Sequence, residues 1–600
     1  MAVSTHSKGC FVEKYYVSHQ EMPEIRHFSS GFMIPRSGIM GVRVKLISTP
    51  AKAGRWGLGG ILLKNKKALF HWILFGMIIM STFFGCALQH GVVPSETVDN
   101  NKKREEVVVA ISTEPSTLDP CQGWGHGNMP LIQSTLIKYN DEMSFEYDLA
   151  VNYSLDETGL VWTFKLRDDA KFTDGEAVTA QDVVFTFETA KAAQASIDLT
   201  FLEKVEAIND TTVTFLLSKP TSVFLNTIAS VGIIPAHAYG ADYGMNPIGS
   251  GPWKFVQWNP QEQLILEANE DYYGIVPSIK KVTIVFMAEE AAFAAVQAGQ
   301  VDVALTAATL ADKTIEGYHL ERVTSVDNRG FTLPVLPNEG NVTEDGYPIG
   351  NNVTCNLEIR QAIAYAIDRE LVAEVALNGF ATPCYSENDK MPWNNPSVMI
   401  ETDVDYAKKL LTSAGWLDSD EDGIVEKDGV VAAFTVLYPS GDSVRQAVAM
   451  AVAEQVKQIG IQITVEGTSW DDLSKHMFSN GVMMGWGAAN PYESYCLYYS
   501  KGAFQEDFYN PEGYQSEKTD KYLSAAMEAL TIEAAYENWQ LAQWDGETGT
   551  CMKGVCPWVW IVNVDHLYYV RDGLDIGRQQ LHPHGASMPL LQNLHTWRWI

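Results

Sequence analysis

Two histidines near the end of the chain have a spacing that suits a transition metal. His582 and His584 are separated only by Pro583, so both imidazoles could face one side of an extended segment. A third histidine, His126, follows Trp124 in a glycine-rich stretch. Imidazole nitrogens are ligands that nickel and other borderline metals accept. The alternatives are a structured turn around Pro583 and a loop histidine that bonds to the backbone.

Alternating aspartates suggest a second kind of cation site. Asp418, Asp420 and Asp422 precede a glycine, as in the first half of a calcium-binding loop. The twelfth position, where a bidentate glutamate is expected, is Gly429. The carboxylates that could compensate are Glu426 and Asp428. The alternative is a solvated acidic turn after a helix.

Arg329 and Arg360 are candidates for binding a ligand carboxylate, because a guanidinium can donate two parallel hydrogen bonds. Arg360 stands at the start of a predicted helix, so it could instead only anchor the chain. The sequence has no HExxH, no GxSxG and no GxxxxGK[ST] motif. The sequence therefore carries none of the signatures that these three motifs give to zinc peptidases, serine hydrolases and P-loop nucleotide-binding proteins.

Cysteine usage leaves the redox state open. Apart from Cys10 and Cys86, the cysteines form an even set: Cys121, Cys355, Cys384, Cys496, Cys551 and Cys556. Cys551 and Cys556 bracket a Lys-Gly turn, which allows a local disulfide hairpin. The alternative is buried free thiols. No closely spaced Cys or His pairs have the spacing of a structural zinc site.

The clearest local pattern is a strand, a turn and a capped helix. Trp162, Phe164 and Leu166 alternate with polar residues, which predicts a half-buried strand. Asp174-Gly175 predicts a tight turn. Thr179 can cap the helix that follows. The residues that mark the buried face of this helix are Val183, Val184 and Phe187.

Helices and strands alternate further along the chain. Glu289–Ala298 has a helical pattern and precedes the apolar strand Val301–Leu305. Ser443–Gln458 is an amphipathic helix that precedes the strand Ile461–Val465. Such alternation favours α/β layers. At 600 residues the chain is too long for one core, and its net charge of −31 argues against nucleic acid as a partner.

Four blocks resemble one family in the same order along the chain. They are Trp162–Glu188, Ile248–Phe255 followed by Asn269–Tyr273, Arg360–Gly379 and Asp405–Trp416. Together they resemble the family 5 extracellular solute-binding proteins, which are peptide- and nickel-binding receptors of ABC importers. Four ordered matches are more specific than one short motif.

The resemblance implies a two-lobed α/β fold of the periplasmic-binding-protein type II class, with a discontinuous lobe I that carries an extra subdomain. Lobe I is expected over 106–283 and 558–600, and lobe II over 284–557. The first crossing between lobes is expected near Lys281–Val285, and the return near Trp558–Val562.

The resemblance also implies a ligand site in the cleft between the lobes. Trp124 and His126 would form a wall of this cleft. Peptide-binding members place an aspartate that pairs with the ligand amine where this chain has Ala488-Ala489. The loop therefore resembles nickel-chelate-binding relatives, with Trp486 and Tyr492 packing on the ligand. The alternative for Trp486 is a place in the core of lobe II.

The N-terminal region resembles a bacterial lipoprotein signal. Lysines precede the apolar run Ala68–Phe84, and Gly85-Cys86 closes it, with Cys86 as the lipidated residue. The alternatives are an uncleaved anchor helix and a secretory signal that is cut nearby. Residues 1–62 are expected to be a non-native extension or disordered, and residues 87–105 a tether.

The expected function is that of a receptor on the outer face of the cell membrane. It would capture a short peptide or a peptide-like nickel chelate and deliver it to an ABC permease and ATPase. No cofactor is required, although nickel could be part of the ligand. The alternative is a ligand-sensing or adhesion lipoprotein on the same scaffold. A hydrolase would need a nucleophile or carboxylate pair in the cleft.

Overall fold

The computed structural model describes residues 104–125, 130–140, 142–195, 197–505, 508–585 and 587–600. The expectations for residues 1–62, for the signal segment with Cys86, for the tether up to residue 103 and for His126 lie outside these residues. In the part of the chain that the structure describes, no helix has the length and apolarity needed to cross a membrane.

A seven-stranded sheet, called here the first sheet, has the strand order β12-β21-β11-β1-β10-β9-β8. Its strands are β1 (Glu106–Ile111), β8 (Trp253–Asn259), β9 (Gln263–Ala268), β10 (Lys281–Phe286), β11 (Val303–Thr306), β12 (Tyr318–Val323) and β21 (His566–Arg571). Val107 and Val109 belong to one core, whereas Ala110 packs with α4 (Glu289–Gln297) in another. Cover on both faces explains why β1 is almost entirely apolar.

A four-stranded sheet, called here the small sheet, has the order β4-β5-β7-β6. Its strands are β4 (Ala150–Leu155), β5 (Val161–Leu166), β6 (Leu202–Asn209) and β7 (Thr212–Leu217). β5 confirms the predicted strand, and its Phe164 is fully buried. The predicted helix is α2 (Ala180–Ala193), which Thr179 caps in a reciprocal pair with Asp182. Gly175 takes a φ of 98° in the predicted turn.

A six-stranded sheet, called here the second sheet, has the order β14-β20-β13-β19-β17-β18. Its strands are β13 (Asn328–Thr332), β14 (Ala381–Pro383), β17 (Ala433–Pro439), β18 (Gln462–Thr468), β19 (Gly481–Met484) and β20 (Trp558–Val564). Alternate residues of β20 enter two different cores, with Val559 and Ile561 in one and Trp558 and Trp560 in the other. This alternation requires helices on both faces.

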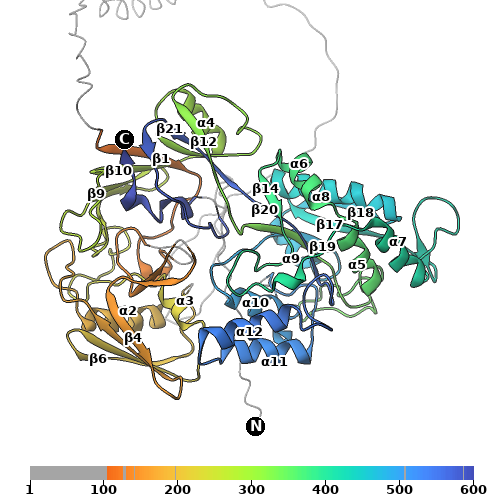
Figure 1. The fold of residues 1–600 in the computed structure, drawn as a ribbon, viewed down its shortest axis with the longest axis horizontal. Helices are drawn as coiled ribbons and strands as arrows, with labels where there is room; N and C mark the ends of the chain where they lie inside the picture. Colours follow the sequence, from red (N-terminus) through yellow and green to blue (C-terminus); the bar gives the residue numbers. More distant parts are fainter. Residues whose placement is uncertain (1–103, 126–129, 141, 196, 506–507, 586) are drawn as a thin grey trace, which may run out of the picture. The chain divides into compact units, whose positions relative to one another are not determined.

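Helices surround the second sheet (Figure 1). Their side chains supply both of its cores. The first core contains residues of α5 (Leu357–Ala366), α6 (Arg369–Leu377), α7 (Val404–Ser413) and α8 (Ser443–Val456). The other core contains residues of α9 (Trp470–His476), α10 (Tyr492–Tyr498), α11 (Glu517–Met527) and α12 (Ile532–Gln543). The two predicted helix–strand pairs are therefore α4 with β11 and α8 with β18, and the α/β class is confirmed.

Shorter elements complete the described fold. Three two-stranded sheets pair β2 (Ile137–Tyr139) with β3 (Phe145–Tyr147), β15 (Glu426–Lys427) with β16 (Val430–Val431), and β22 (Leu574–Asp575) with β23 (Arg598–Trp599). A short helix, α3 (Phe224–Ile228), packs into the core of the small sheet. The 3-10 turns are η1 (Pro120–Gln122), η2 (Pro396–Val398), η3 (Lys457–Ile459), η4 (Ser500–Gly502), η5 (Pro589–Leu591) and η6 (Leu594–Thr596).

The chain changes sheets at positions that differ from the predicted ones. β10 pairs with β1 along its whole length, and β11 and β12 also stay in the first sheet. The outward crossing is therefore residues 324–327, and the return is at Asp565, between β20 and β21. Lys281–Val285 and Trp558–Val562 lie inside strands. The resemblance misplaced both crossings, because matching motifs do not identify which strands pair with one another in this chain.

The expected disulfide hairpin is not formed. Cys551 and Cys556 are both free thiols, and both are buried. Backbone hydrogen bonds hold their loop, in which the N–H groups of Gly554 and Cys556 donate to the carbonyl of Cys551. For Cys551 and Cys556 this outcome corresponds to the alternative of buried free thiols, whereas Cys496 is disulfide-bonded.

Candidate functional site

Asp327 lies on the outward crossing, and its carboxylate binds side chains from three segments. Oδ1 accepts a hydrogen bond from Nη1 of Arg329 and lies 2.6 Å from Nδ1 of His584. Oδ2 lies 3.2 Å from Nε2 of His566. Burial alone would raise the pKa of the Asp327 carboxyl, but Arg329, His584 and the hydrogen bond from His566 hold this pKa well below its usual range. Asp327 is therefore a buried carboxylate that organises the crossing.

Two buried guanidinium groups lie beside this crossing. Arg329 binds Asp327, and Arg445 binds Asp442, the N-cap residue of α8. Burial lowers the pKa of Arg445, and the charge of Arg329 lowers it further. Nε of each guanidinium has no hydrogen-bond partner among the described residues. An unpaired buried N–H is unfavourable, so each guanidinium keeps one hydrogen-bond donor that the described residues do not satisfy.

Trp486 adds a third unpaired donor. Its backbone N–H donates to Oδ1 of Asn328 at 2.8 Å, which places the loop after β19 next to β13. Its ring stacks on Tyr509 with centroids 4.4 Å apart and an angle of 14° between the planes. Its indole Nε1 is buried and finds no acceptor in the described part of the chain. Trp486 therefore packs against the core of the second sheet and still keeps one N–H available.

Glu493 is the only acidic residue in the loop Gly485–Tyr495, and it does not face outward. Its carboxyl accepts hydrogen bonds from the backbone N–H groups of Gly487 and Ala488, at 3.1–3.2 Å. Burial raises the pKa of Glu493 to about 8, although these two N–H groups oppose the shift. The loop therefore presents no free carboxylate that could pair with a charged ligand amine.

Segments attached to the first and small sheets contact this loop. The hydroxyl of Tyr139 donates to the carbonyl of Ala489 at 2.8 Å, and the backbone N–H of His584 donates to the carbonyl of Gly487 at 2.8 Å. The hydroxyl of Tyr492 donates to Oδ2 of Asp198 at 3.5 Å. The loop thus lies where the parts built on the first and second sheets meet.

Only some of the residues that the sequence predicted as ligand-binding lie near Asp327 and the loop Gly485–Tyr495. The structure brings Arg329, Trp486, Tyr492 and His584 into the region of Asp327 and the loop. Their contact with a ligand stays a prediction. Sequence reasoning missed Asp327, Glu493, Arg445 and Tyr139. A local signal existed for Arg445 alone, because Asp442 lies three residues before it at the start of a helix.

Trp124 does not line a cleft. It is 4% exposed, belongs to a core of the first sheet and donates its indole N–H to Oε1 of Gln133 at 3.1 Å. The expectation of a cleft wall is therefore corrected for Trp124. The glycine-rich stretch signalled a loop, but the alternation of polar and apolar residues was too short there to show that the indole faces inward.

Arg360 has an anchoring role. Its guanidinium donates to the carbonyls of Val555, Thr354 and Cys355 at 2.7–3.0 Å, and the residue is 3% exposed. These bonds tie the start of α5 to the segment before β20. The ligand-binding expectation for Arg360 is replaced by the anchoring alternative, because all three guanidinium nitrogens already bind backbone carbonyls.

His582 is not placed to hold a metal. It is fully buried, its Nδ1 lies 3.0 Å from Nδ1 of His566, and its Nε2 lies 3.4 Å from Oε1 of Gln579. His582 and His584 therefore do not act as a pair on one side, because His584 turns to Asp327 instead. The metal-ligand expectation for His582 is corrected by this burial.

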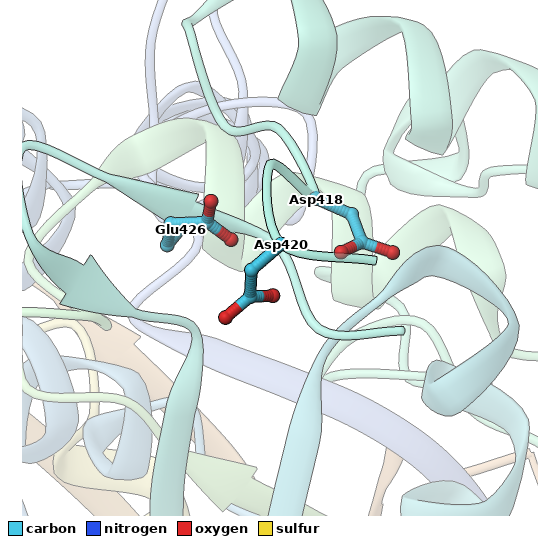
Figure 2. A group of neighbouring side chains, drawn as sticks. All are labelled: Asp418, Asp420 and Glu426. Carbon is cyan, nitrogen blue, oxygen red and sulfur yellow. The ribbon is translucent and has the colours of Figure 1, made fainter. Parts of the chain in front are cut away.

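The acidic loop after α7 brings three carboxylates together (Figure 2). Oxygen atoms of Asp418, Asp420 and Glu426 lie within 4.8 Å of one another, and Asp422 is not part of this group. Asp418, Asp420 and Asp422 each accept a backbone N–H of the same turn, at 2.8–3.3 Å. These bonds stabilise the turn without a cation, which fits the solvated acidic turn, and the calcium site stays an untested alternative.

One shallow hollow lies elsewhere, on α2. It encloses about 500 Å³ and is lined by Gln122, Phe185, Glu188, Thr189, Ala192 and Ala193. Glu188 is its single charged group. Ligand sites combine apolar walls with several converging polar groups, and this hollow lacks them.

Comparison with known proteins identifies relatives of this chain. It is 29% identical to protein XP55 of Streptomyces lividans over 494 residues, which cover 78% of this chain and 86% of XP55. It is 30% identical to the oligopeptide-binding protein AppA of Bacillus subtilis over 395 residues, which cover 62% of this chain and 70% of AppA.

A solved structure supports the two-lobed fold. NikZ from Campylobacter jejuni, in complex with Ni(L-His), matches with a TM-score of 0.67 and 23% identity, over 82% of this chain and 99% of NikZ. Residues 144–506 match the family described as bacterial extracellular solute-binding proteins, family 5, middle region. The ordered motifs, the two large sheets between which the chain passes twice, and these matches agree, and the chain belongs to the family 5 bacterial extracellular solute-binding proteins.

Proposed function

We propose that this protein is the extracytoplasmic receptor of an ABC importer and that it captures a small, carboxylate-bearing ligand beside Asp327 and the loop Gly485–Tyr495. The ligand is a peptide-like nickel chelate or a short peptide, and the geometry favours the chelate. The receptor would deliver this ligand to the permease and ATPase. Lipidation of Cys86 would hold the receptor on the outer face of the cell membrane.

The observation that carries this proposal is the set of buried donors without acceptors. Nε of Arg329, Nε of Arg445 and Nε1 of Trp486 are each buried, and none finds a partner in the described chain. Arg329 and Arg445 interact electrostatically with each other and with Asp442. A ligand carboxylate would satisfy these donors and offset the cost of leaving them unpaired.

The preference for a chelate follows from the missing carboxylate. A charged α-amine buried without a partner costs several kcal/mol, and Glu493 is already bound to the N–H groups of Gly487 and Ala488. In a nickel chelate the amine nitrogen is bound to the metal and carries no ammonium charge. The NikZ structure contains Ni(L-His), whereas AppA is described as oligopeptide-binding.

Native mass spectrometry of the freshly purified full chain, combined with elemental analysis, tests the ligand class. We expect nickel together with an amino-acid-sized mass. A ladder of peptide masses without metal would contradict the preference for a chelate but retain the receptor. If neither nickel–histidine nor a tripeptide binds in calorimetric titrations, the proposed function fails.

A matched pair of variants tests the site. Trp486→Phe keeps the stacking on Tyr509 but removes the unpaired N–H, so we expect nickel–histidine affinity to fall roughly threefold to tenfold. Trp416→Phe is the control, because its indole N–H is also buried and unpaired but lies in a core of the second sheet. If both variants lost the same amount of affinity, the ligand site would not lie beside Trp486.

A further inference from the structure

Tyr139 ends β2 and packs against two cores that belong to different lobes. One lobe is built on the first and small sheets, and the other on the second sheet. The ring of Tyr139 lies 5.1 Å from the ring of Phe145, centroid to centroid, and packs against the core of the small sheet. The same side chain packs against the core that contains residues of α10, α11 and α12. Tyr139 therefore lies at the junction of the two lobes.

The hydroxyl of Tyr139 has two partners, and their chemistry fixes the position of its hydrogen. It lies 2.8 Å from the carbonyl oxygen of Ala489 and 3.0 Å from Nδ2 of Asn226 in α3. A carbonyl oxygen can only accept, so the hydroxyl donates its single hydrogen to Ala489. The amide of Asn226 then donates to the hydroxyl oxygen. A directed chain of hydrogen bonds thus runs from α3 through β2 to the loop Gly485–Tyr495.

The rest of this junction is also made by the chain's own groups. The backbone N–H of Ser222, which precedes α3, donates to the carbonyl of Met527 at the end of α11, at 2.7 Å. Val223 and Met143 come from the segments before α3 and between β2 and β3, yet they belong to the core that contains α10, α11 and α12. They are 2% and 6% exposed. Separation of the lobes would expose these side chains and break the bond of Ser222, so the junction favours the closed arrangement.

The bond from Tyr139 differs from the other hydrogen bonds of the loop. The carboxyl of Glu493 in α10 accepts the N–H of Gly487, and this bond survives separation because both groups lie in one lobe. The N–H of His584 donates to the carbonyl of Gly487 beside the outward crossing, where a hinge movement displaces atoms least. The bond from Tyr139 to Ala489 joins β2 to the loop instead, so separation of the lobes must break it.

We propose that Tyr139 is a positioning residue for ligand capture, whose hydroxyl holds the loop Gly485–Tyr495 in place when the two lobes close. This role rests on the proposed function, because that function places the ligand beside this loop. Closure itself needs no ligand group, since the chain makes every bond of the junction, and the ligand-free protein therefore also populates the closed state.

The size of the effect follows from the loss of one hydrogen bond. A bond of this kind changes the ratio of closed to open protein roughly fivefold. A ligand that leaves only through the open state should then dissociate faster by the same factor when the hydroxyl is absent. Its association rate should not change, because the open state that it enters is the same.

Tyr139→Phe tests the proposal because it keeps the ring and removes only the hydroxyl. Hydrogen–deuterium exchange of the ligand-free full chain, followed by mass spectrometry at single-residue resolution, measures the closed state through the backbone N–H of Ser222. We expect this N–H to exchange roughly fivefold faster in Tyr139→Phe than in the wild type. The N–H groups of Thr227 and Ala229, which donate to the carbonyls of Val223 and Leu225, should exchange at unchanged rates.

Three results would overturn the proposal. An unprotected N–H of Ser222 in the wild type would mean that the closed state is not populated without a ligand. An equal rate in the wild type and the variant would mean that the hydroxyl does not stabilise this state. Equal acceleration of Ser222, Thr227 and Ala229 would mean that the variant only loosens α3.

Tyr569→Phe is the matched control. The hydroxyl of Tyr569 lies 2.8 Å and 2.7 Å from the carbonyl oxygens of Leu310 and Lys313, and all three residues lie in the lobe of the first sheet. Exchange of Ser222 in this variant should stay within about twofold of the wild-type rate, because distant sites act independently. If both variants accelerated this exchange equally, the effect would not come from the bond between the lobes, and the proposal would fail.

Stopped-flow kinetics with nickel–L-histidine as the probe tests the consequence for ligand capture. The dissociation rate should be roughly fivefold higher in Tyr139→Phe, whereas the association rate should stay within about twofold of the wild type. A slower association with an unchanged dissociation rate would overturn the positioning role. If the wild type does not bind nickel–histidine, the chelate preference of the proposed function fails, and the exchange of Ser222 still decides whether Tyr139 holds the lobes together.

Discussion

Replacing Glu493 by glutamine separates the structural role of this side chain from its charge. Glu493 is partly buried and accepts hydrogen bonds from the loop Gly485–Tyr495, and burial raises the pKa of its carboxyl to about 8, above the usual 4.5. Between these two values the native state holds a proton that the unfolded chain has lost. The stability contributed by the protonated form is therefore complete below pH 4.5 and is lost progressively as pH rises towards 8.

The magnitude follows from the number of protons. One additional bound proton changes the free energy of unfolding by about 1.4 kcal/mol per pH unit. Glutamine stays neutral and can still accept the N–H groups of Gly487 and Ala488 through its carbonyl oxygen. From pH 5 to 6.5, Glu493→Gln should therefore gain about 2 kcal/mol relative to the wild type. Below pH 6.5 the neighbouring Glu387, whose pKa burial raises to about 7, stays mostly protonated in both proteins.

Urea denaturation at half-unit pH steps measures this difference. Glu533→Gln on α12 is the matched control, because Glu533 is exposed at the first turn of its helix. The control should follow the wild type at every pH. A difference between Glu493→Gln and the wild type that does not change with pH would refute the reasoning, since it would mean that the buried carboxyl binds no proton on folding.

Two further predictions concern residues with two competing roles. Arg360→Gln should lower the free energy of unfolding, measured by urea denaturation, by roughly 3 kcal/mol, because it leaves the buried carbonyls of Val555 and Thr354 unpaired. The control is Arg598→Gln, an exposed position, which should lower the free energy of unfolding by less than about 0.5 kcal/mol. If Arg360→Gln instead weakened ligand binding and left the free energy of unfolding unchanged, Arg360 would be a ligand-binding residue after all. Calcium at 1 mM should leave the melting temperature of the full chain unchanged within a degree, because backbone donors already stabilise the acidic loop; a rise of several degrees that Asp420→Asn abolishes would establish a calcium site.

Local patterns determined the parts of this fold whose causes are local. The strand β5 follows from the alternation of apolar and polar residues, and the start of α2 follows from the capping residue Thr179. The turn follows from Gly175, because glycine readily adopts the positive φ that the turn needs. Each of these causes acts within a few residues, so it can be read from a short stretch of sequence. The order of four such blocks was then enough to predict the family and the α/β class.

The candidate site was only partly predictable, because its members are far apart in the chain. Asp327 and His566 are 239 residues apart, and Asp327 and His584 are 257 apart. Arg329 and Arg360 had equal standing in the sequence, yet one lies beside Asp327 and the other binds backbone carbonyls. No local pattern distinguishes these outcomes.

The sequence by itself determined which elements form, where several of them begin and which side of each is apolar, because these depend on propensity and on the period of the hydrophobic pattern. Only the tertiary structure decided which strands are neighbours, and so placed both crossings, buried His582 and turned Glu493 inward. The physical reason is that strand pairing and the burial of polar groups are settled by long-range packing and by the balance of hydrogen-bond donors and acceptors, which come together only when distant segments meet.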